Sequence, residues 1–241
     1  MSLPAHFLNC STTDTIVKAA KWQSFLKENN FNFDSIKSID FSNSCPVVTD
    51  PDGNKFSINF AENKVNYSKK KGGLKSEPIA RALGSGRYGM RVLDLSAGLG
   101  IDAVFLAQMG FQVTAVERNP LIYLCLQNAI EQSPIEGLRF QFAQSIAFLS
   151  STDEDYDVVY FDPMFPEKRK SALPRQEMVF FKHLVGADDD ASKVLKAAIG
   201  LNGIKRVVVK RPLKAPYLDS KPVACIEGKL IRFDIYGTGE K

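Results

Sequence analysis

From residue 91 onward, short apolar runs alternate with longer stretches in which apolar residues recur at helical spacing. The short runs predict strands over residues 92–95, 111–116, 138–142, 157–161 and 206–209. The longer stretches predict helices over residues 102–109, 120–130 and 188–199, and a short helix over residues 146–149. Strands that alternate with helices favour a doubly wound, mostly parallel α/β sheet with helices on both faces.

The two ends of the chain depart from this alternation. Residues 223–226 and 230–236 are apolar runs separated by a short turn, which predicts an antiparallel C-terminal hairpin at the edge of the sheet. Near the start, the pattern predicts a helix over residues 13–26 and a half-buried strand over residues 56–60. We therefore expect a small N-terminal α+β appendage, residues 1–75, followed by an α/β domain, residues 76–241.

A glycine-rich turn joins the first strand of the α/β domain to its first helix. Gly98 and Gly100 allow a sharp turn and a close approach to a ligand, where the helix start presents unpaired N–H groups. Glu117 ends the next strand, where a carboxylate can bind ribose hydroxyls. These features indicate a cofactor that contains adenosine. They fit both S-adenosylmethionine (SAM) and a nicotinamide dinucleotide.

Two acidic residues at strand ends favour SAM. Asp94 precedes the glycine-rich turn, where a carboxylate suits an ammonium and a sulfonium and would sit poorly beside a pyrophosphate. Asp162 closes the fourth strand and begins an Asp-Pro-Met-Phe sequence, a variant of the Asp/Asn-Pro-Pro-aromatic loop of amino-group methyltransferases. The alternative for Asp162 is an ordinary turn after a strand. Its position after the glycine turn and Glu117 favours the catalytic interpretation.

The residues of this loop have the groups that methylation of a nucleobase amine requires. The Asp162 carboxylate and the Pro163 carbonyl can accept hydrogen bonds from an exocyclic NH2 and orient its lone pair toward a methyl donor. Phe165 can stack on the base. Gln144 and Ser145, after the third strand, permit two interpretations: they cap the short helix, or they contact the adenine ring.

Basic residues gather in three parts of a chain whose net charge is +4. The candidate RNA contacts among them are Lys69, Lys70 and Lys71, then Lys168, Arg169 and Lys170, then Lys210 and Arg211. Any one cluster is more often a solvated surface than a binding site. Because two of the three lie beside chemical motifs, their distribution favours a nucleic-acid partner.

Composition argues against membrane, secreted and metal-binding classes. No apolar run approaches the ~20 residues that span a bilayer. The start of the chain lacks the basic and apolar regions of a secretion signal, so we expect a cytoplasmic protein. The four cysteines lack metal-ligand spacing, so we expect no metal site.

Several motifs together resemble the ribosomal RNA small subunit methyltransferase J family. They are residues 94–103, 117–120, 160–166, 170–173 and 206–212, with the basic stretch 69–73 and the closing run 232–236. The Asp-Pro-Met-Phe-Pro and Val-Val-Val-Lys-Arg-Pro runs are far more specific than the glycine motif. The resemblance covers roughly residues 65–237 and fades in the first sixty.

The resemblance implies a Rossmann-like class I methyltransferase fold with SAM as cofactor. It implies methylation of the N2 amine of a guanosine in 16S rRNA, as free RNA or within the small ribosomal subunit. It also implies SAM contacts at Ile101, Asp102, Glu117, Arg118, Gln144, Ser145 and Asp162. Ile101 stands where the family tends to have Arg, and Gln144 where it tends to have Ser. Backbone contacts at these two positions would survive the change, whereas side-chain contacts would differ.

Three alternatives remain open from the sequence. A nicotinamide-dependent oxidoreductase would share the glycine motif and Glu117. A catalytically silent RNA-binding module would share the basic clusters, although it would not require Asp162. An amino methyltransferase could act on DNA adenine or on protein glutamine instead. The oligomeric state and the target nucleotide leave no signal in the sequence.

Overall fold

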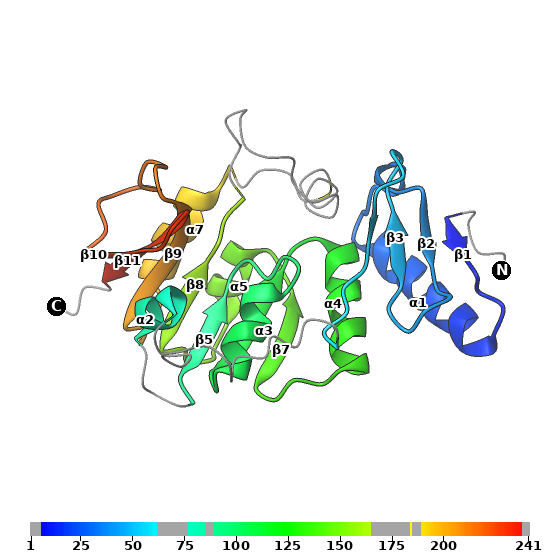
Figure 1. Cartoon of the computed structure of the whole chain (residues 1–241), viewed down its shortest axis with the longest axis horizontal. Helices are drawn as coiled ribbons and strands as arrows, with labels where there is room; N and C mark the ends of the chain where they lie inside the picture. The colour runs from blue at the N-terminus through cyan, green and yellow to red at the C-terminus, as the bar shows by residue number, and fades with distance from the viewer. Residues whose placement is uncertain (1–5, 62–76, 85–88, 165–183, 185–188, 238–241) are drawn as a thin grey trace. The chain divides into compact units, whose positions relative to one another are not determined.

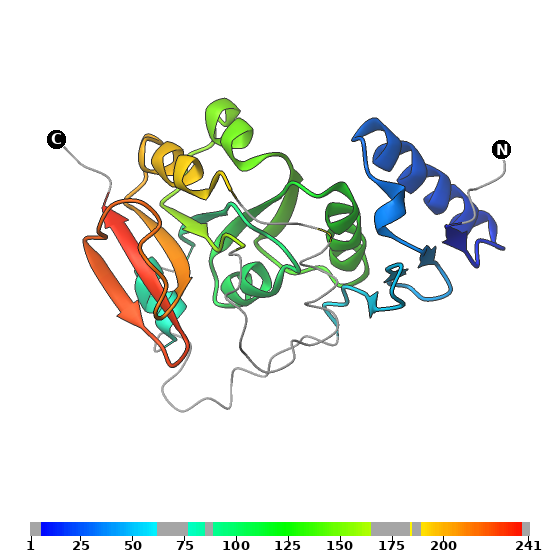
Figure 2. The same ribbon diagram turned by 90° about the horizontal axis from the view of Figure 1, so that it is seen from above.

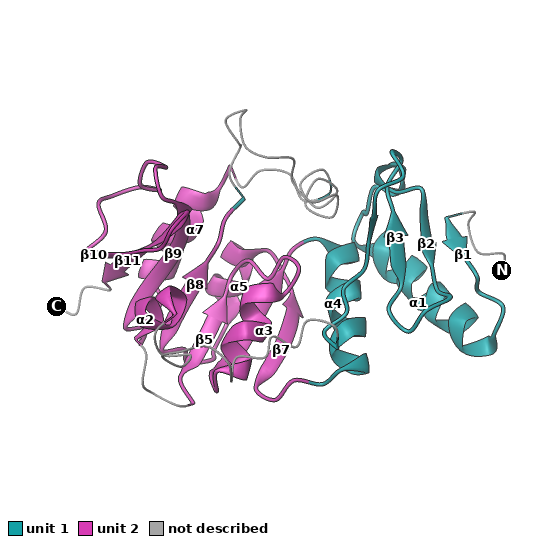
Figure 3. Ribbon diagram, viewed as in Figure 1, with its two compact units in different colours: residues 1–63, 119–134, 164–187 teal, residues 64–118, 135–163, 188–241 magenta. Residues whose placement is uncertain are grey.

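The computed structural model describes residues 6–61, 77–84, 89–164, 184 and 189–237. Contacts divide the chain into two compact units (Figure 3). The larger unit comprises residues 64–118, 135–163 and 188–241. The smaller unit comprises residues 1–63, 119–134 and 164–187.

A seven-stranded sheet forms the centre of the larger unit (Figure 1). Its strand order is β10-β11-β9-β8-β5-β6-β7. The strands are β5 Arg91–Asp94, β6 Gln112–Glu117, β7 Leu138–Phe142, β8 Val158–Phe161, β9 Arg206–Pro212, β10 Ala224–Glu227 and β11 Ile231–Gly237. Strands β5 to β9 pair in parallel, and β11 and β10 continue the sheet in antiparallel pairing.

Helices cover both faces of this sheet because its central strands are apolar on both sides. All four residues of β8 are buried, as expected of a strand inside a parallel sheet. Helices α2 Pro78–Leu83 and α3 Ile101–Gln108 lie on one face, and α5 Ser145–Ser151 and α7 Ala191–Ile199 lie on the other (Figure 2). The α5 and α7 side packs into one apolar core that includes Leu93, Val159 and Val207.

The chain reverses its direction across the sheet between β5 and β8. It runs outward from β5 through β6 to β7, and then returns beside β5 to form β8 and β9. In such a sheet, ligands bind at the carboxyl ends of the strands beside the reversal. Asp94 ends β5 and lies opposite Tyr160, so Asp94 and Asp162 share this carboxyl edge.

The smaller unit contains a four-stranded sheet with helices α1 and α4. Its elements within the described residues are β1 Phe7–Leu8, α1 Thr13–Glu28, a 3-10 turn Phe33–Ser35, β2 Ser38–Asp40, β3 Val47–Thr49, β4 Lys55–Phe56 and α4 Pro120–Gln132. The Thr12 side chain caps α1, and Trp22 packs edge-on against Phe41 with ring centroids 5.3 Å apart. The rings of Phe25 and Tyr123 lie 5.7 Å apart and join α1 to α4. The helix that follows β6 in the chain therefore belongs to this unit.

The structure confirms the doubly wound sheet and its C-terminal hairpin, and every strand predicted in the larger unit is present. The strand predicted over residues 56–60 is wrong in extent. Phe56, Ile58 and Phe60 are buried in alternation, but only Lys55 and Phe56 pair with β3. No helix within the described ranges is long and apolar enough to cross a membrane.

Two further boundaries differ from the sequence analysis. The helix predicted over residues 188–199 begins at Ala191, because Asp189 and Asp190 form a turn, while residue 188 lies outside the described residues. The predicted domain boundary between residues 75 and 76 also lies outside them and stays a prediction.

A buried ion pair holds the antiparallel edge of the larger sheet. Arg232 and Asp234 lie two residues apart on β11, and both side chains are buried. The guanidinium donates to both carboxylate oxygens, at 2.8 Å from Nε and 3.1 Å from Nη2. Its Nη1 donates to the carbonyls of Pro212 and Leu213, so the charge links β11 to the end of β9. Removing one partner of such a buried ion pair costs much free energy of folding, because the other charge stays buried.

We predict that Asp234→Ala lowers the free energy of unfolding by ~3–5 kcal/mol, because it leaves the Arg232 charge buried without its carboxylate. Urea denaturation followed by circular dichroism measures the change. The control is Asp155→Ala, which removes an exposed partner 3.6 Å from Arg91 and should cost less than ~1 kcal/mol. Equal effects of the two substitutions would contradict the assignment of this pair to the stability of the sheet.

Candidate functional site

The glycine-rich turn lies between Asp94, at the end of β5, and Ile101, at the start of α3. Gly98 and Gly100 have φ values of 53° and 76°, in the left-handed region that glycine adopts without strain. The Gly98 N–H donates to Glu117 Oε2 at 2.9 Å. Glu117, which ends β6 and is predicted to bind the ribose, therefore lies directly beside the turn.

Asp94 is almost completely buried at the base of this turn, with 1% of its surface exposed. Its Oδ1 accepts hydrogen bonds from the Ser96 N–H at 2.9 Å and from the Ser96 hydroxyl at 3.2 Å. Burial raises the pKa of Asp94 to about 7, the Ser96 N–H opposes this rise, and the carboxylates of Asp102 and Asp162 add to it. A positively charged ligand would favour the ionised form of this carboxyl group.

The loop that follows β8 is joined to the glycine-rich turn. The Asp162 N–H donates to Ser96 Oγ at 2.7 Å, and Ser96 in turn contacts Asp94. Pro163 is buried and Met164 is half-buried. The predicted stacking residue, Phe165, lies outside the described residues. The structure thus brings together Asp94 and Asp162, which are 68 positions apart (162 − 94) in the sequence.

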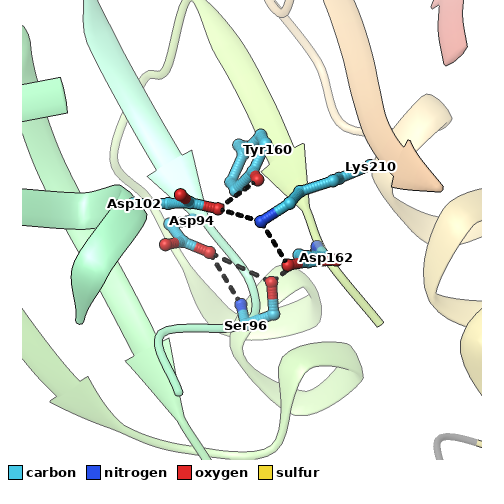
Figure 4. A network of polar contacts seen from close by, with 6 residues as sticks. All are labelled: Asp94, Ser96, Asp102, Tyr160, Asp162 and Lys210. Atoms are coloured by element: carbon cyan, nitrogen blue, oxygen red, sulfur yellow. Dashed lines mark hydrogen bonds and ion pairs between the residues drawn. The ribbon is translucent and has the colours of Figure 1, made fainter. Parts of the chain in front are cut away.

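A lysine from β9 joins the acidic groups of this edge (Figure 4). Lys210 Nζ lies 2.9 Å from Asp162 Oδ2 and 2.8 Å from Asp102 Oδ2. The Tyr160 hydroxyl donates to the same Asp102 oxygen at 2.6 Å. Burial lowers the pKa of Lys210, but the carboxylates of Asp162 and Asp102 outweigh burial and raise it above its ordinary value. The ammonium is therefore charged at neutral pH.

These groups fit SAM better than a pyrophosphate cofactor. The carboxylates of Asp94, Asp102 and Asp162 gather at this edge, and those of Asp102 and Asp162 contact the Lys210 ammonium (Figure 4). The arrangement leaves net negative charge beside the glycine-rich turn, which attracts a sulfonium and an ammonium and repels phosphates. Within the described residues, no group of three or more His, Cys, Asp or Glu side chains is arranged to hold a metal ion.

Other predicted cofactor contacts lie along the same edge in different environments. Ile101 begins α3 and is 62% exposed. Arg118 follows β6 and pairs with Asp190, Nη1 to Oδ1, at 3.8 Å. Gln144 is the exposed N-cap of α5, without a side-chain cap hydrogen bond, and Ser145 donates to the Leu95 carbonyl at 2.9 Å. Gln144 therefore occupies the N-cap position that the first interpretation gave it, although its side chain makes no cap hydrogen bond, and contact of these residues with the adenine ring stays a prediction.

Lys210 and Arg211 do not form the exposed basic cluster expected from the sequence. The side chain of Lys210 pairs with carboxylates, as described above. Arg211 is only 4% exposed, and its Nη2 donates to the Pro216 carbonyl at 2.5 Å. The strand alternation of β9 sends the two side chains to opposite faces, and both are engaged in intramolecular contacts. The other predicted RNA contacts, Lys69, Lys70, Lys71, Lys168, Arg169 and Lys170, lie outside the described residues.

Sequence reasoning missed Ser96 and Tyr160, and it assigned Lys210 to RNA. Ser96 was visible within the glycine motif and Tyr160 within the Tyr-Phe-Asp-Pro run. Their roles require knowing which strand ends are neighbours. That information resides in the pairing of β5, β8 and β9.

Comparison with known proteins identifies the family. Residues 44–238 match a family model described as "Putative SAM-dependent methyltransferase". A ribosomal RNA small subunit methyltransferase J of Bdellovibrio bacteriovorus is 44% identical over 230 residues, which cover 92% of this chain and 91% of that protein. The protein of the same name from Shewanella sediminis is 40% identical, over 86% of this chain and 85% of its own.

The chain belongs to the ribosomal RNA small subunit methyltransferase J family. SAM is accordingly its cofactor, and the alternative of a nicotinamide-dependent oxidoreductase is wrong. The similarity extends further toward the N-terminus than the motifs indicated, because 92% coverage cannot leave out the first sixty residues. A crystal structure of a SAM-dependent methyltransferase from Neisseria gonorrhoeae shares the fold, with a TM-score of 0.70 over 98% of this chain and 96% of that one at 24% identity.

We predict that ionisation of Asp94 lowers the free energy of unfolding of the SAM-free protein as the pH rises. Folding raises the pKa of this carboxyl group from 3.8 to about 7, so the folded protein binds the proton more tightly than the unfolded chain between these values. The free energy of unfolding therefore falls as the pH rises through this window. Relative to Asp94→Asn, the wild type should lose about 2–3 kcal/mol between about pH 5 and about pH 8.

Urea denaturation of both proteins at the two pH values measures this difference. Asp155→Asn serves as the control, because it removes an exposed carboxyl group that pairs with Arg91 outside the site. Parallel pH profiles for the wild type and Asp94→Asn would show that Asp94 is not the titrating group.

Proposed function

We propose that the protein transfers a methyl group from SAM to the exocyclic N2 amine of a guanosine in 16S ribosomal RNA. The observation that carries the proposal is the position of Asp162. It follows β8 at the carboxyl edge, its N–H bonds to the turn that precedes α3, and it is followed by Pro163. Relatives 40–44% identical are named ribosomal RNA small subunit methyltransferases, which supports rRNA as the substrate.

The amine of guanine is a weak nucleophile because its lone pair is conjugated with the ring. The Asp162 carboxylate and the Pro163 carbonyl accept hydrogen bonds from its two N–H groups and turn the lone pair toward the methyl donor. They also stabilise the positive charge that develops on nitrogen. SAM, when bound, supplies a methyl group activated by the sulfonium. As the bond from the methyl group to nitrogen forms, its bond to sulfur breaks and leaves S-adenosyl-L-homocysteine. The methylated amine is acidic and loses a proton to water, so the chain needs no strong general base.

The cofactor is proposed to lie along the glycine-rich turn. Asp94 and Asp102 face its positive charges, Gly98 and Gly100 allow close approach of the backbone, and Glu117 binds the ribose hydroxyls. The remaining proposed contacts are Ile101, Arg118, Gln144, Ser145 and Asp162. Ser145 keeps its bond to the Leu95 carbonyl in this arrangement and contributes through the backbone near the adenine ring.

The RNA is proposed to contact the basic residues of two sequence clusters, Lys69, Lys70, Lys71, Lys168, Arg169 and Lys170. Phosphate neutralisation by lysine and arginine provides much of the affinity of RNA-binding proteins. The partner is 16S rRNA, either free or in the small ribosomal subunit, and the protein would act in the cytoplasm, where ribosomes assemble.

We predict that Asp162→Asn lowers the rate of methyl transfer by ~10²-fold or more, comparable to the loss of one preorganised transition-state contact. The substitution keeps the shape but removes the charge and replaces one acceptor oxygen with a donor. Transfer of labelled methyl groups to 16S rRNA and to small subunits measures the rate, and mass spectrometry of the nucleosides identifies the product.

The matched control is Asp157→Asn at the opposite end of β8, where the carboxylate pairs with Lys205 at 2.5 Å. It should retain a rate close to that of the wild type. Detection of a methylated adenosine or of a methylated protein would overturn the guanosine assignment. A folded Asp162→Asn variant with a near-normal rate would show that the amine is bound elsewhere.

We also predict that Glu117→Ala weakens SAM binding by ~1.5–3 kcal/mol, the range for a hydrogen bond to a charged group. Isothermal titration calorimetry measures the affinity. Glu117→Gln keeps an acceptor for the Gly98 N–H, so it should bind SAM more tightly than the alanine variant. Unchanged affinity in Glu117→Ala would remove this residue from the cofactor site.

A further inference from the structure

Lys210 occupies a position that neither the basic pattern of the sequence nor the proposed chemistry explains. It lies on β9, is half-buried, and contacts two carboxylates from different elements (Figure 4). A phosphate-binding lysine is expected to project into solvent, but this ammonium is 2.9 Å from the carboxylate of the proposed catalytic residue, Asp162. Its contacts therefore point to a role at the methyl-transfer site.

Strand register places Lys210 beside Asp162. The pairs Tyr160↔Val208 and Phe161↔Val209 are the last two between β8 and β9, and Asp162 and Lys210 are the next residues on each chain. Two packed parallel strands thus determine the approach of the ammonium to the carboxylate. Asp102, at the start of α3, binds the same ammonium from its other side, at 2.8 Å, and Tyr160 donates to Asp102.

The charges around Asp162 make such a partner necessary. Among the described residues, the groups near it include Lys210 from β9, Asp102 from α3, Asp94 from β5 and Tyr160 from β8. Two of them are carboxyl groups, and their negative charge favours protonation of Asp162. The ammonium of Lys210 opposes this effect at a distance where an ion pair in a half-buried site is strong.

We propose that Lys210 is a positioning residue for methyl transfer, which keeps the Asp162 carboxylate ionised and oriented toward the target amine. This inference rests on the proposed function, because Asp162 acts as a hydrogen-bond acceptor there. A protonated Asp162 would present a donor on one oxygen and would no longer attract the developing charge on nitrogen. Asp102, on α3, pairs with Lys210 and accepts a hydrogen bond from Tyr160, on β8. Residues of both elements therefore help to hold the ammonium in place.

The test compares Lys210→Met, which keeps most of the length of the side chain without its charge, with Lys210→Arg, which keeps the charge. The kcat for methylation of 16S rRNA is measured from about pH 5 to about pH 9 at saturating SAM and RNA. We expect Lys210→Met to lower kcat about tenfold or more at neutral pH. The acid limb of its kcat–pH profile, where kcat falls as the pH is lowered, should move by ~1 pH unit or more toward higher pH. The reason is that the Asp162 carboxyl group loses its cationic neighbour.

Lys210→Arg should restore the acid limb to a position near that of the wild type. The matched control is Lys205→Met, which removes the ion pair with Asp157 at the amino ends of the same two strands. Its acid limb should coincide with that of the wild type. If Lys210→Met fails to fold by circular dichroism, Lys210→Gln replaces it, and the same shift is expected.

An acid limb that stays in place in Lys210→Met or Lys210→Gln would overturn the inference. A weaker salt dependence of RNA binding together with an unmoved acid limb would assign Lys210 to a phosphate instead. Wild-type protein is assayed in parallel. Absence of methyl transfer by the wild type would count against the proposed function itself, whereas an active wild type with an unmoved limb in the variant would refute only the role of Lys210.

Discussion

The Ser96 hydroxyl joins the two loops on which the site depends. It accepts a hydrogen bond from the Asp162 N–H at 2.7 Å and lies 3.2 Å from the Asp94 carboxylate. One loop carries the cofactor-binding turn and the other carries the residue proposed to bind the amine. In the proposed mechanism, these Ser96 contacts and the direct pairing of β5 with β8 set the distance between methyl donor and acceptor. Such a short, rigid connection suits a reaction whose catalysis is largely positioning.

Charge is distributed unevenly between this site and the rest of the chain. The protein carries a net charge of +4, yet carboxylates gather at the carboxyl edge of the sheet. Acidic groups suit a cofactor with two positive charges, and the basic stretches elsewhere suit a polyanionic substrate. The crowding has a measurable consequence, because burial and neighbouring carboxylates raise the pKa of Asp94 to about 7. In the proposed mechanism, the Lys210 ammonium opposes the negative charge of the neighbouring carboxylates at Asp162.

Similarity to the Bdellovibrio protein covers 92% of the chain, whereas the recognisable motifs lie in the part that follows residue 65. The difference has a physical origin. Residues that bind a cofactor or a reacting amine are chemically constrained, so they form short motifs that are visible in one sequence. Residues 6–61 of the smaller unit are held by packing, as between Trp22 and Phe41, and apolar packing tolerates many substitutions that keep volume and pattern. Its relationship therefore appears only when whole chains are compared.

The sequence by itself determined the alternation of strands and helices, the glycine-rich turn, and the positions of Asp94, Glu117 and Asp162 at strand ends. These features follow from local periodicity and from residue types with few alternative uses. It could not determine the environment of Lys210 and Arg211, which are neighbours on β9. Alternation along a strand separates two such side chains, but the facing elements decide what each one meets.

Here the pairing of β8 with β9 places Lys210 beside Asp162, and the fold places Arg211 at the Pro216 carbonyl. Similarly, Ser145 bonds to the Leu95 carbonyl instead of capping its helix, because β5 ends nearby. Both outcomes depend on strand register and on contacts between residues about 50 positions apart, from Lys210 to Asp162 and from Ser145 to Leu95 (210 − 162 = 48 and 145 − 95 = 50). Such contacts form only when the sheet is assembled, so only the tertiary structure decided them.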